Sequence, residues 1–179
     1  TPKGSAILHV REDRRKEIVP LVISHAGHLA EPFAERFYWP GTYDPSAVLC
    51  VPDAIEWLGS LLPGGWPELM ERNRTLCLAA RRMILSDLSL PEPCPEKMIG
   101  TLATFVLPAA GVPVSVNYKG IDPLQEALYT RYGIEIPVWS WQNPPATLIR
   151  IAVQLYNSED QYRYLAEALK ELLPTGSGR

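Results

Sequence analysis

Hydrophobic and polar positions follow two different periods along this chain, and the changes of period divide it into elements. Short apolar runs rich in β-branched residues are typical of extended segments. They predict strands or extended stretches at 5–10, 18–24, 99–107, 134–141 and 147–156. The prolines of 143–145 separate the last two of these runs.

Helical spacing of apolar residues predicts four helices, and each has a recognisable start. Asp-Pro pairs at 44–45 and 122–123 offer a capping carboxylate followed by a proline that suits the first turn. The first of these helices runs to about 62 with a kink at Pro52, and the second ends at Gly133.

The other two helices begin at Pro67 and after Ser158. The helix from Pro67 extends for about two dozen residues, and its arginines are expected on the outer face, opposite an apolar stripe. That stripe consists of Leu69, Leu76, Ala79, Ala80, Met83 and Ile84. Glu159 and Asp160 favour the helix after Ser158 through its dipole, and it runs to 173.

From residue 99 onward the order is strand, helix, strand, strand, helix. This order predicts an α+β or α/β arrangement, with a small mixed or antiparallel sheet covered by helices on one side. Trp139 and Trp141 share one strand face and are expected to fill the core or line a pocket.

Composition excludes several classes of function. A formal net charge of -3 offers no basic field for nucleic acid or an anionic membrane. No apolar run is long enough to span a bilayer, since the best candidate at 47–62 is interrupted by Pro52, Asp53 and Glu56.

Cysteines and histidines suggest no metal site. The cysteines form no closely spaced pair, and their odd number predicts reduced, buried thiols in a cytoplasmic protein: Cys50, Cys77 and Cys94. The histidines lack acidic or cysteine partners at ligand spacing and are interpreted as loop or core residues: His9, His25 and His28.

Arg150 is the most suggestive residue, because it interrupts an apolar strand at 148–153. A guanidinium cannot shed its charge there, so it needs an acidic partner or a solvent-facing site. Its planar fork matches both oxygens of a carboxylate. The residues alone leave two roles open for Arg150: a surface arginine in contact with water, or a residue that binds a carboxylate.

Residues 148–158 resemble the signature of aminotransferase class V enzymes, in which a strand arginine is followed by Tyr-Asn-Thr. Ser158 stands at the threonine position. The branch that resembles this chain most is the isopenicillin N epimerase-like one. The resemblance implies a fold-type I enzyme dependent on pyridoxal 5'-phosphate (PLP), in which Arg150 binds the α-carboxylate of an amino-acid substrate.

The segment 40–42, Pro-Gly-Thr, is the second match. In the family a Gly-Thr pair before a helix reaches the PLP phosphate of the partner subunit, which implies a homodimer. The resemblance therefore assigns cofactor binding to Thr42 and, through its backbone, to Gly41. Asp44 departs from the related pattern and is expected to cap the helix instead of approaching a phosphate.

The opening segment 2–8 resembles the stretch that follows the cofactor lysine in these enzymes. Lys3 stands at the wrong place in that motif and is interpreted as a surface lysine. The Schiff-base lysine is therefore expected upstream of Thr1, and no catalytic residue is assigned in this chain. The resemblance makes 1–45 the end of the large domain, 46–90 connecting helices, 91–175 the C-terminal small domain and 176–179 a disordered tail.

The activity class stays open within the family. Residues 134–147 contain no cysteine, which disfavours persulfide-forming desulfurase chemistry but leaves epimerase, aminotransferase and lyase activity. Epimerisation also needs a second acid/base, which the sequence does not identify. A non-catalytic interaction or dimerisation module is the alternative. As a fragment of a dimeric enzyme, the chain alone is expected to be inactive and to self-associate through exposed apolar surface.

Overall fold

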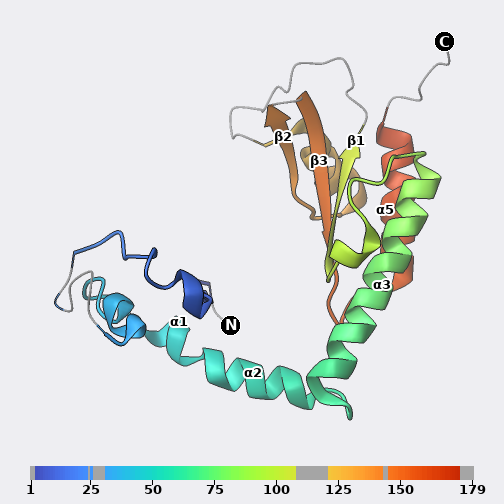
Figure 1. Cartoon of the computed structure of the whole chain (residues 1–179). Coiled ribbons are helices and arrows are strands. Elements are labelled where there is room, and N and C mark those ends of the chain that lie inside the picture. The colour runs from blue at the N-terminus through green and yellow to red at the C-terminus, as the bar shows by residue number, and fades with distance from the viewer. Residues whose placement is uncertain (1–2, 24, 26–30, 108–120, 143–144, 174–179) are drawn as a thin grey trace. The chain divides into compact units, whose positions relative to one another are not determined.

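The computed structural model describes residues 3–23, 25, 31–107, 121–142 and 145–173 (Figure 1). The described chain divides into two compact units, Thr1–Ser60 and Leu61–Arg179. Each is described by itself below. The tail at 176–179, predicted to be disordered, lies outside the described residues.

Short helices make up the first unit. They are the 3₁₀ helices η1 and η2 and the α-helices α1 and α2: Glu12–Arg14, Phe33–Phe37, Ser46–Leu49 and Val51–Ser60. The kinked helix predicted from 44 onward is thus divided at Cys50. Pro52 explains the division, because its ring excludes the carbonyl of the residue four positions earlier and it has no N–H to donate.

The strand predicted at 5–10 is wrong, and residues 18–23 form no strand either. Ile7 and Leu8 are exposed by 76% and 69%. A strand is stabilised by backbone hydrogen bonds to a neighbour, which a β-prone sequence cannot supply by itself. The described part of the first unit offers no such neighbour.

No apolar side chain is buried in the described part of the first unit. The buried residue there is Arg36, which donates to the carbonyl oxygens of Arg15 (3.1 Å) and Ile18 (3.4 Å) and pairs with Glu31. In the described part of this unit, polar contacts of Arg36 therefore link η2 to residues 15, 18 and 31.

The second unit contains a three-stranded antiparallel sheet in the order β1-β3-β2. The strands are Leu102–Leu107 (β1), Val138–Gln142 (β2) and Pro145–Ala152 (β3). Its helices are Gly65–Asp87 (α3), Pro123–Tyr132 (α4) and Glu159–Leu172 (α5), and a short 3₁₀ helix η3 covers Glu96–Met98. Figure 1 shows α3 and α5 lying alongside each other next to the sheet.

The core lies between one face of this sheet and the three helices. Ile149 and Ile151 of β3 are buried with their cross-strand neighbours on β1, Phe105 and Ala103. The helices contribute further buried residues to the same cluster, among them Ile84, Leu128, Leu165 and Leu169. This arrangement confirms the small antiparallel sheet with helices that the order of elements predicted.

Helix ends in the second unit follow the predicted signals. Asp122 Oδ1 accepts a hydrogen bond from the amide of Leu124 (2.8 Å), and Gly133 ends α4 with a left-handed φ of 66°. At the start of α5, the side chain of Gln161 accepts from the amide of Ser158 (3.1 Å). These ends could be predicted because the interactions that make them are local.

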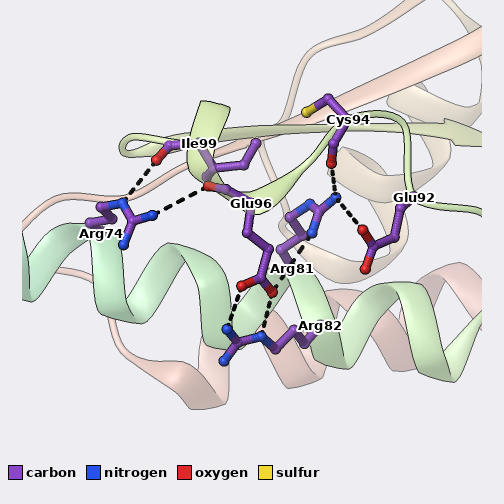
Figure 2. Close-up of polar contacts among 7 residues, drawn as sticks. All are labelled: Arg74, Arg81, Arg82, Glu92, Cys94, Glu96 and Ile99. Carbon is purple, nitrogen blue, oxygen red and sulfur yellow. Dashed lines mark hydrogen bonds and ion pairs between the residues drawn. The ribbon is translucent and has the colours of Figure 1, made fainter.

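The arginines of α3 correct another prediction, since Arg81 is fully buried and not on the outer face. Its Nη2 donates to the carbonyl of Cys94 (2.6 Å) and lies 3.6 Å from Glu92, and its Nη1 lies 4.0 Å from Glu96 (Figure 2). Among the described residues, Nε and Nη1 have no hydrogen-bond partner. Neighbouring Arg82 is exposed and pairs with Glu96 (2.5 Å).

Arg74 completes this group of three arginines by donating to the carbonyls of Ile99 (3.1 Å) and Glu96 (3.3 Å). Figure 2 shows the three side chains reaching from α3 to the connection that precedes β1. The stretch 92–99 covers Arg81 and excludes water from it. Because these residues lie outside α3, the spacing of apolar residues within the helix could not predict the burial of Arg81. The three arginines therefore bind the segment before β1 to α3.

No helix among the described residues is both long enough and apolar enough to cross a membrane.

Exchange of the neighbouring residues Arg81 and Arg82 for glutamine should distinguish the stability contribution of buried contacts from that of exposed ones. Arg81→Gln should lower the free energy of unfolding by about 2–3 kcal/mol, because it removes a charge-assisted hydrogen bond and leaves space in the core. Arg82→Gln, the matched control, should cost less than about 1 kcal/mol because its ion pair is exposed. Urea denaturation measures both, and equal losses would contradict this account.

Tyr162 should make stability sensitive to alkaline pH. Its hydroxyl donates to the carbonyl of Ala152 (2.8 Å), and burial, with smaller contributions from Cys77 and Tyr156, raises its pKa to about 12. A folded-state pKa above the unfolded value of about 10 means that this stabilisation is complete below pH 10 and lost as the pH rises towards 12.

Tyr162→Phe should therefore lose about 1 kcal/mol at pH 8, where the hydrogen bond is intact, and should show a shallower decline between pH 10 and 12. Unfolding by urea at several pH values gives both quantities. Tyr129→Phe serves as the control, since Tyr129 is 62% exposed. A Tyr162→Phe decline as steep as that of the unaltered chain would refute the assignment.

Candidate functional site

Alternation along β3 directs Arg150 away from the helices. Ile149 and Ile151 are buried, so the residue between them projects from the opposite face of the sheet. Arg150 is exposed there, directly across from Thr104 of β1. We call this side of the sheet, which the described helices leave uncovered, the open face.

Within the described residues Arg150 makes no hydrogen bond and no ion pair. Two other exposed arginines of the same unit are paired, Arg163 with Glu159 (2.9 Å) and Arg82 with Glu96 (2.5 Å). A guanidinium without a carboxylate of its own keeps its donors available to a ligand.

A hollow of about 480 Å³ lies next to Arg150, at the end of β3. Its walls come from the end of β3, from the stretch between α4 and β2, and from the start of α5. Apart from Arg150, the lining comprises Tyr132, Gly133, Ile134, Glu135, Ile136, Pro137, Ile151, Ala152, Tyr156, Asn157, Gln161, Tyr162, Tyr164 and Leu165. Arg150 therefore borders a space large enough for an amino acid.

Polar contacts fix the turn that follows β3. The side chain of Asn157 accepts from the amide of Gln154 (2.9 Å), and Gln154 accepts from Asn73 of α3 (2.8 Å). Tyr162 binds the carbonyl of Ala152 from α5. The Tyr-Asn-Ser stretch after Arg150 thus anchors the end of the strand, while Tyr156 lines the hollow.

Several lining residues were not singled out from the sequence. Tyr132 and Tyr164 pack edge to face with ring centroids 6.2 Å apart, and the hydroxyl of Tyr132 donates to Glu171 (2.7 Å). That contact raises the pKa of Tyr132. These residues come from different elements, so no local pattern could have grouped them.

Trp139 and Trp141 lie on the open face, with Trp139 across from Leu148. Trp139 is half-buried and Trp141 is 56% exposed, so neither belongs to the buried core. Neither lines the hollow beside Arg150. His9 and His25 are exposed, and His28 lies outside the described residues.

Gly41 and Thr42 belong to the first unit, and both are exposed. Gly41 has a φ of +148°, and a Cβ built there would meet nothing within 4 Å. The hydroxyl of Thr42 makes no hydrogen bond with described residues. The backbone and hydroxyl of this pair are thus accessible, although α1 is too short to act as a helix dipole.

Asp44 turns towards α1, as the sequence predicted. Its Oδ1 accepts hydrogen bonds from the hydroxyl (2.6 Å) and the amide (2.9 Å) of Ser46. These two bonds hold the pKa of Asp44 below its usual value. The carboxylate is therefore engaged at the helix start.

No family model matches the chain. Among curated proteins it is 32% identical to isopenicillin N epimerase of Amycolatopsis lactamdurans over 188 residues, which are 96% of this chain and 44% of that protein. The epimerase of the same name from Streptomyces clavuligerus is 27% identical over 189 residues, again 96% and 44%.

A probable chloroplastic L-cysteine desulfhydrase of Arabidopsis thaliana is 27% identical over 185 residues, which are 98% of this chain and 38% of that protein. The chain thus spans about two fifths of the length of the curated relatives it matches. Relatives of both kinds align with nearly all of it, and they confirm the resemblance to isopenicillin N epimerase-like enzymes that the motifs around Arg150 and Thr42 indicated.

Proposed function

We propose that this chain is the C-terminal part of a PLP-dependent enzyme of the isopenicillin N epimerase-like kind, an amino-acid epimerase or aminotransferase, and that Arg150 binds the substrate carboxylate. The observation that carries the proposal is an exposed arginine in a central strand, without an acidic partner among the described residues, beside a hollow of about 480 Å³. The names of the relatives, isopenicillin N epimerase and L-cysteine desulfhydrase, indicate small-molecule substrates. A hollow of this size is consistent with such a substrate.

The role of Arg150 is binding and orientation. Two parallel N–H···O bonds from a guanidinium fix the plane of a carboxylate as well as its position. The strand limits the movement of the arginine backbone, because β3 is hydrogen-bonded on both sides. Arg150 would thereby hold the substrate's Cα at a constant place while a proton moves at that atom.

Cofactor binding by this chain would involve Gly41 and Thr42. Their exposed hydroxyl and open backbone fit the phosphate of PLP, and the engagement of Asp44 with Ser46 keeps a carboxylate occupied near that pair. When bound, PLP withdraws electrons from the substrate and makes its Cα proton acidic. The lysine that carries PLP is not assigned to this chain, so the chain alone is proposed to be inactive.

The surface of the first unit supports a larger assembly. Leu21, Trp57 and Leu49 are exposed by 102%, 62% and 69%, and no described apolar side chain of that unit is buried. Apolar surface of this extent is typical of an interface. The homodimer that the resemblance implies, in a cytoplasmic enzyme, is part of the same proposal.

A C–S lyase is the second candidate activity. It rests on the similarity to the L-cysteine desulfhydrase of Arabidopsis thaliana. The same Arg150 would bind the carboxylate in either reaction, so the arginine does not distinguish them. A non-catalytic dimerisation module is the alternative. A strand arginine that lies beside a hollow and has no acidic partner among the described residues favours a ligand-binding role.

Carboxylate binding by Arg150 can be tested with N-acetyl-L-alanine, whose amino group is blocked. NMR titration of the full chain should show saturable shifts of the Arg150 side-chain resonances. Arg150→Gln should weaken binding at least about tenfold, because a charge-assisted bidentate contact is lost. Arg163→Gln, an exposed arginine already paired with Glu159, should leave affinity unchanged. Equal affinity of the Arg150→Gln variant would refute the proposal.

Absorbance spectra test the proposed absence of the cofactor lysine. When the chain is mixed with equimolar PLP, the visible absorbance of a lysine-bound cofactor should not appear. The reference is a mixture of PLP with a simple amine, which gives the absorbance of nonspecific adducts. Lys3→Arg should leave the spectrum unchanged, since Lys3 is exposed and outside the motif position. A stoichiometric adduct that disappears in Lys3→Arg would overturn this part of the proposal.

A further inference from the structure

The open face carries two polar side chains at its centre, Thr104 of β1 and Arg150 of β3. They are direct cross-strand partners. Their neighbours on the same face are apolar: Leu102, Val106, Trp139, Leu148 and Ala152. Arg150 and Thr104 thus form a polar pair on an otherwise apolar part of the open face. In ligand sites, a few polar groups among apolar ones orient the ligand.

The register brings the two side chains close together. The amide of Val153 donates to the carbonyl of Thr101 (2.8 Å), so these residues form a hydrogen-bonded pair. Such pairs alternate along an antiparallel ladder. Thr104 and Arg150 therefore form a non-hydrogen-bonded pair, in which the Cα atoms lie only about 4.5 Å apart and the side chains approach each other.

The hydroxyl of Thr104 has no hydrogen-bond partner among the described residues, although the side chain is half-buried. A β-branched residue in a strand has few accessible χ1 rotamers, so the hydroxyl is held near one position. A carboxylate offers about four lone-pair positions, and a bidentate arginine occupies two of them. One carboxylate can thus accept bonds from both residues.

We propose that Thr104 is a second ligand of the carboxylate that Arg150 binds, with its hydroxyl donating to one of the carboxylate oxygens. This inference rests on the proposed function of Arg150. It also assigns specificity, because a planar carboxylate accepts both contacts while an uncharged ester or amide does not satisfy the guanidinium.

The test uses the same NMR titration of the full chain with N-acetyl-L-alanine. Thr104→Val preserves shape and removes the hydroxyl, so it should weaken binding about tenfold. Thr104→Ser keeps the hydroxyl and should restore affinity to within about twofold of the unaltered chain. Thr147→Val is the matched control: it is the same exchange in the same sheet, on the opposite face, and should have no effect.

The outcomes separate the two proposals. Loss of binding in Arg150→Gln with unchanged affinity in Thr104→Val overturns the role of Thr104 and leaves that of Arg150 intact. Unchanged affinity in Arg150→Gln, or no saturable shift at Arg150 in the unaltered chain, overturns both. If Thr104→Val does not fold, nuclear Overhauser contacts between the Thr104 methyl group and the bound ligand decide, and their absence overturns the role of Thr104.

Discussion

Burial of Ile149 and Ile151 on one side of β3 is the constraint on which the rest of the second unit depends. Both side chains are almost completely enclosed, and β3 is paired on both edges. Because side chains alternate in a strand, enclosing these two places Arg150 outside. A slip of one residue would bury the guanidinium and expose the isoleucines, so hydrophobic burial fixes the register and with it the candidate site.

Two arginines of this unit show how surroundings decide what a guanidinium can do. Arg81 is fully enclosed by α3 and the stretch before β1, where it donates to the carbonyl of Cys94 and lies near Glu92. Its donors are unavailable to a ligand. Arg150 lies on the open face, where water can solvate it and its donors are accessible. The two guanidinium groups thus differ in access, although the residue type is the same.

The sequence predicted the elements whose determinants are local. The ends of α4 and α5 followed from Asp122, Gly133 and Ser158, because capping involves residues a few positions apart. The alternation around Arg150 likewise indicated a strand with one unusual residue. The prediction of a strand at 5–10 was wrong because a strand requires a neighbouring strand, which the local sequence does not reveal.

The covering of Arg81 and the hollow beside Arg150 were also beyond local pattern. Arg81 is buried by residues 92–99, which come back over α3 after its end. The hollow is assembled from β3, the stretch before β2 and α5, which are separated along the chain. The motif singled out Arg150 from the sequence, but the space next to it arises only when these elements pack together.

The residues proposed to bind the carboxylate and the phosphate differ in how far they are preorganised. Arg150 extends from a strand bonded on both edges and supported by a core, so its position relative to Thr104 is set before a ligand arrives. Thr42 stands in a unit whose described apolar side chains are not buried. Backbone that is not supported by packed apolar side chains resists deformation poorly, since packing is what makes protein interiors stiff. In the proposed enzyme the carboxylate site would therefore be formed by this chain itself, whereas the phosphate contact would become fixed through assembly.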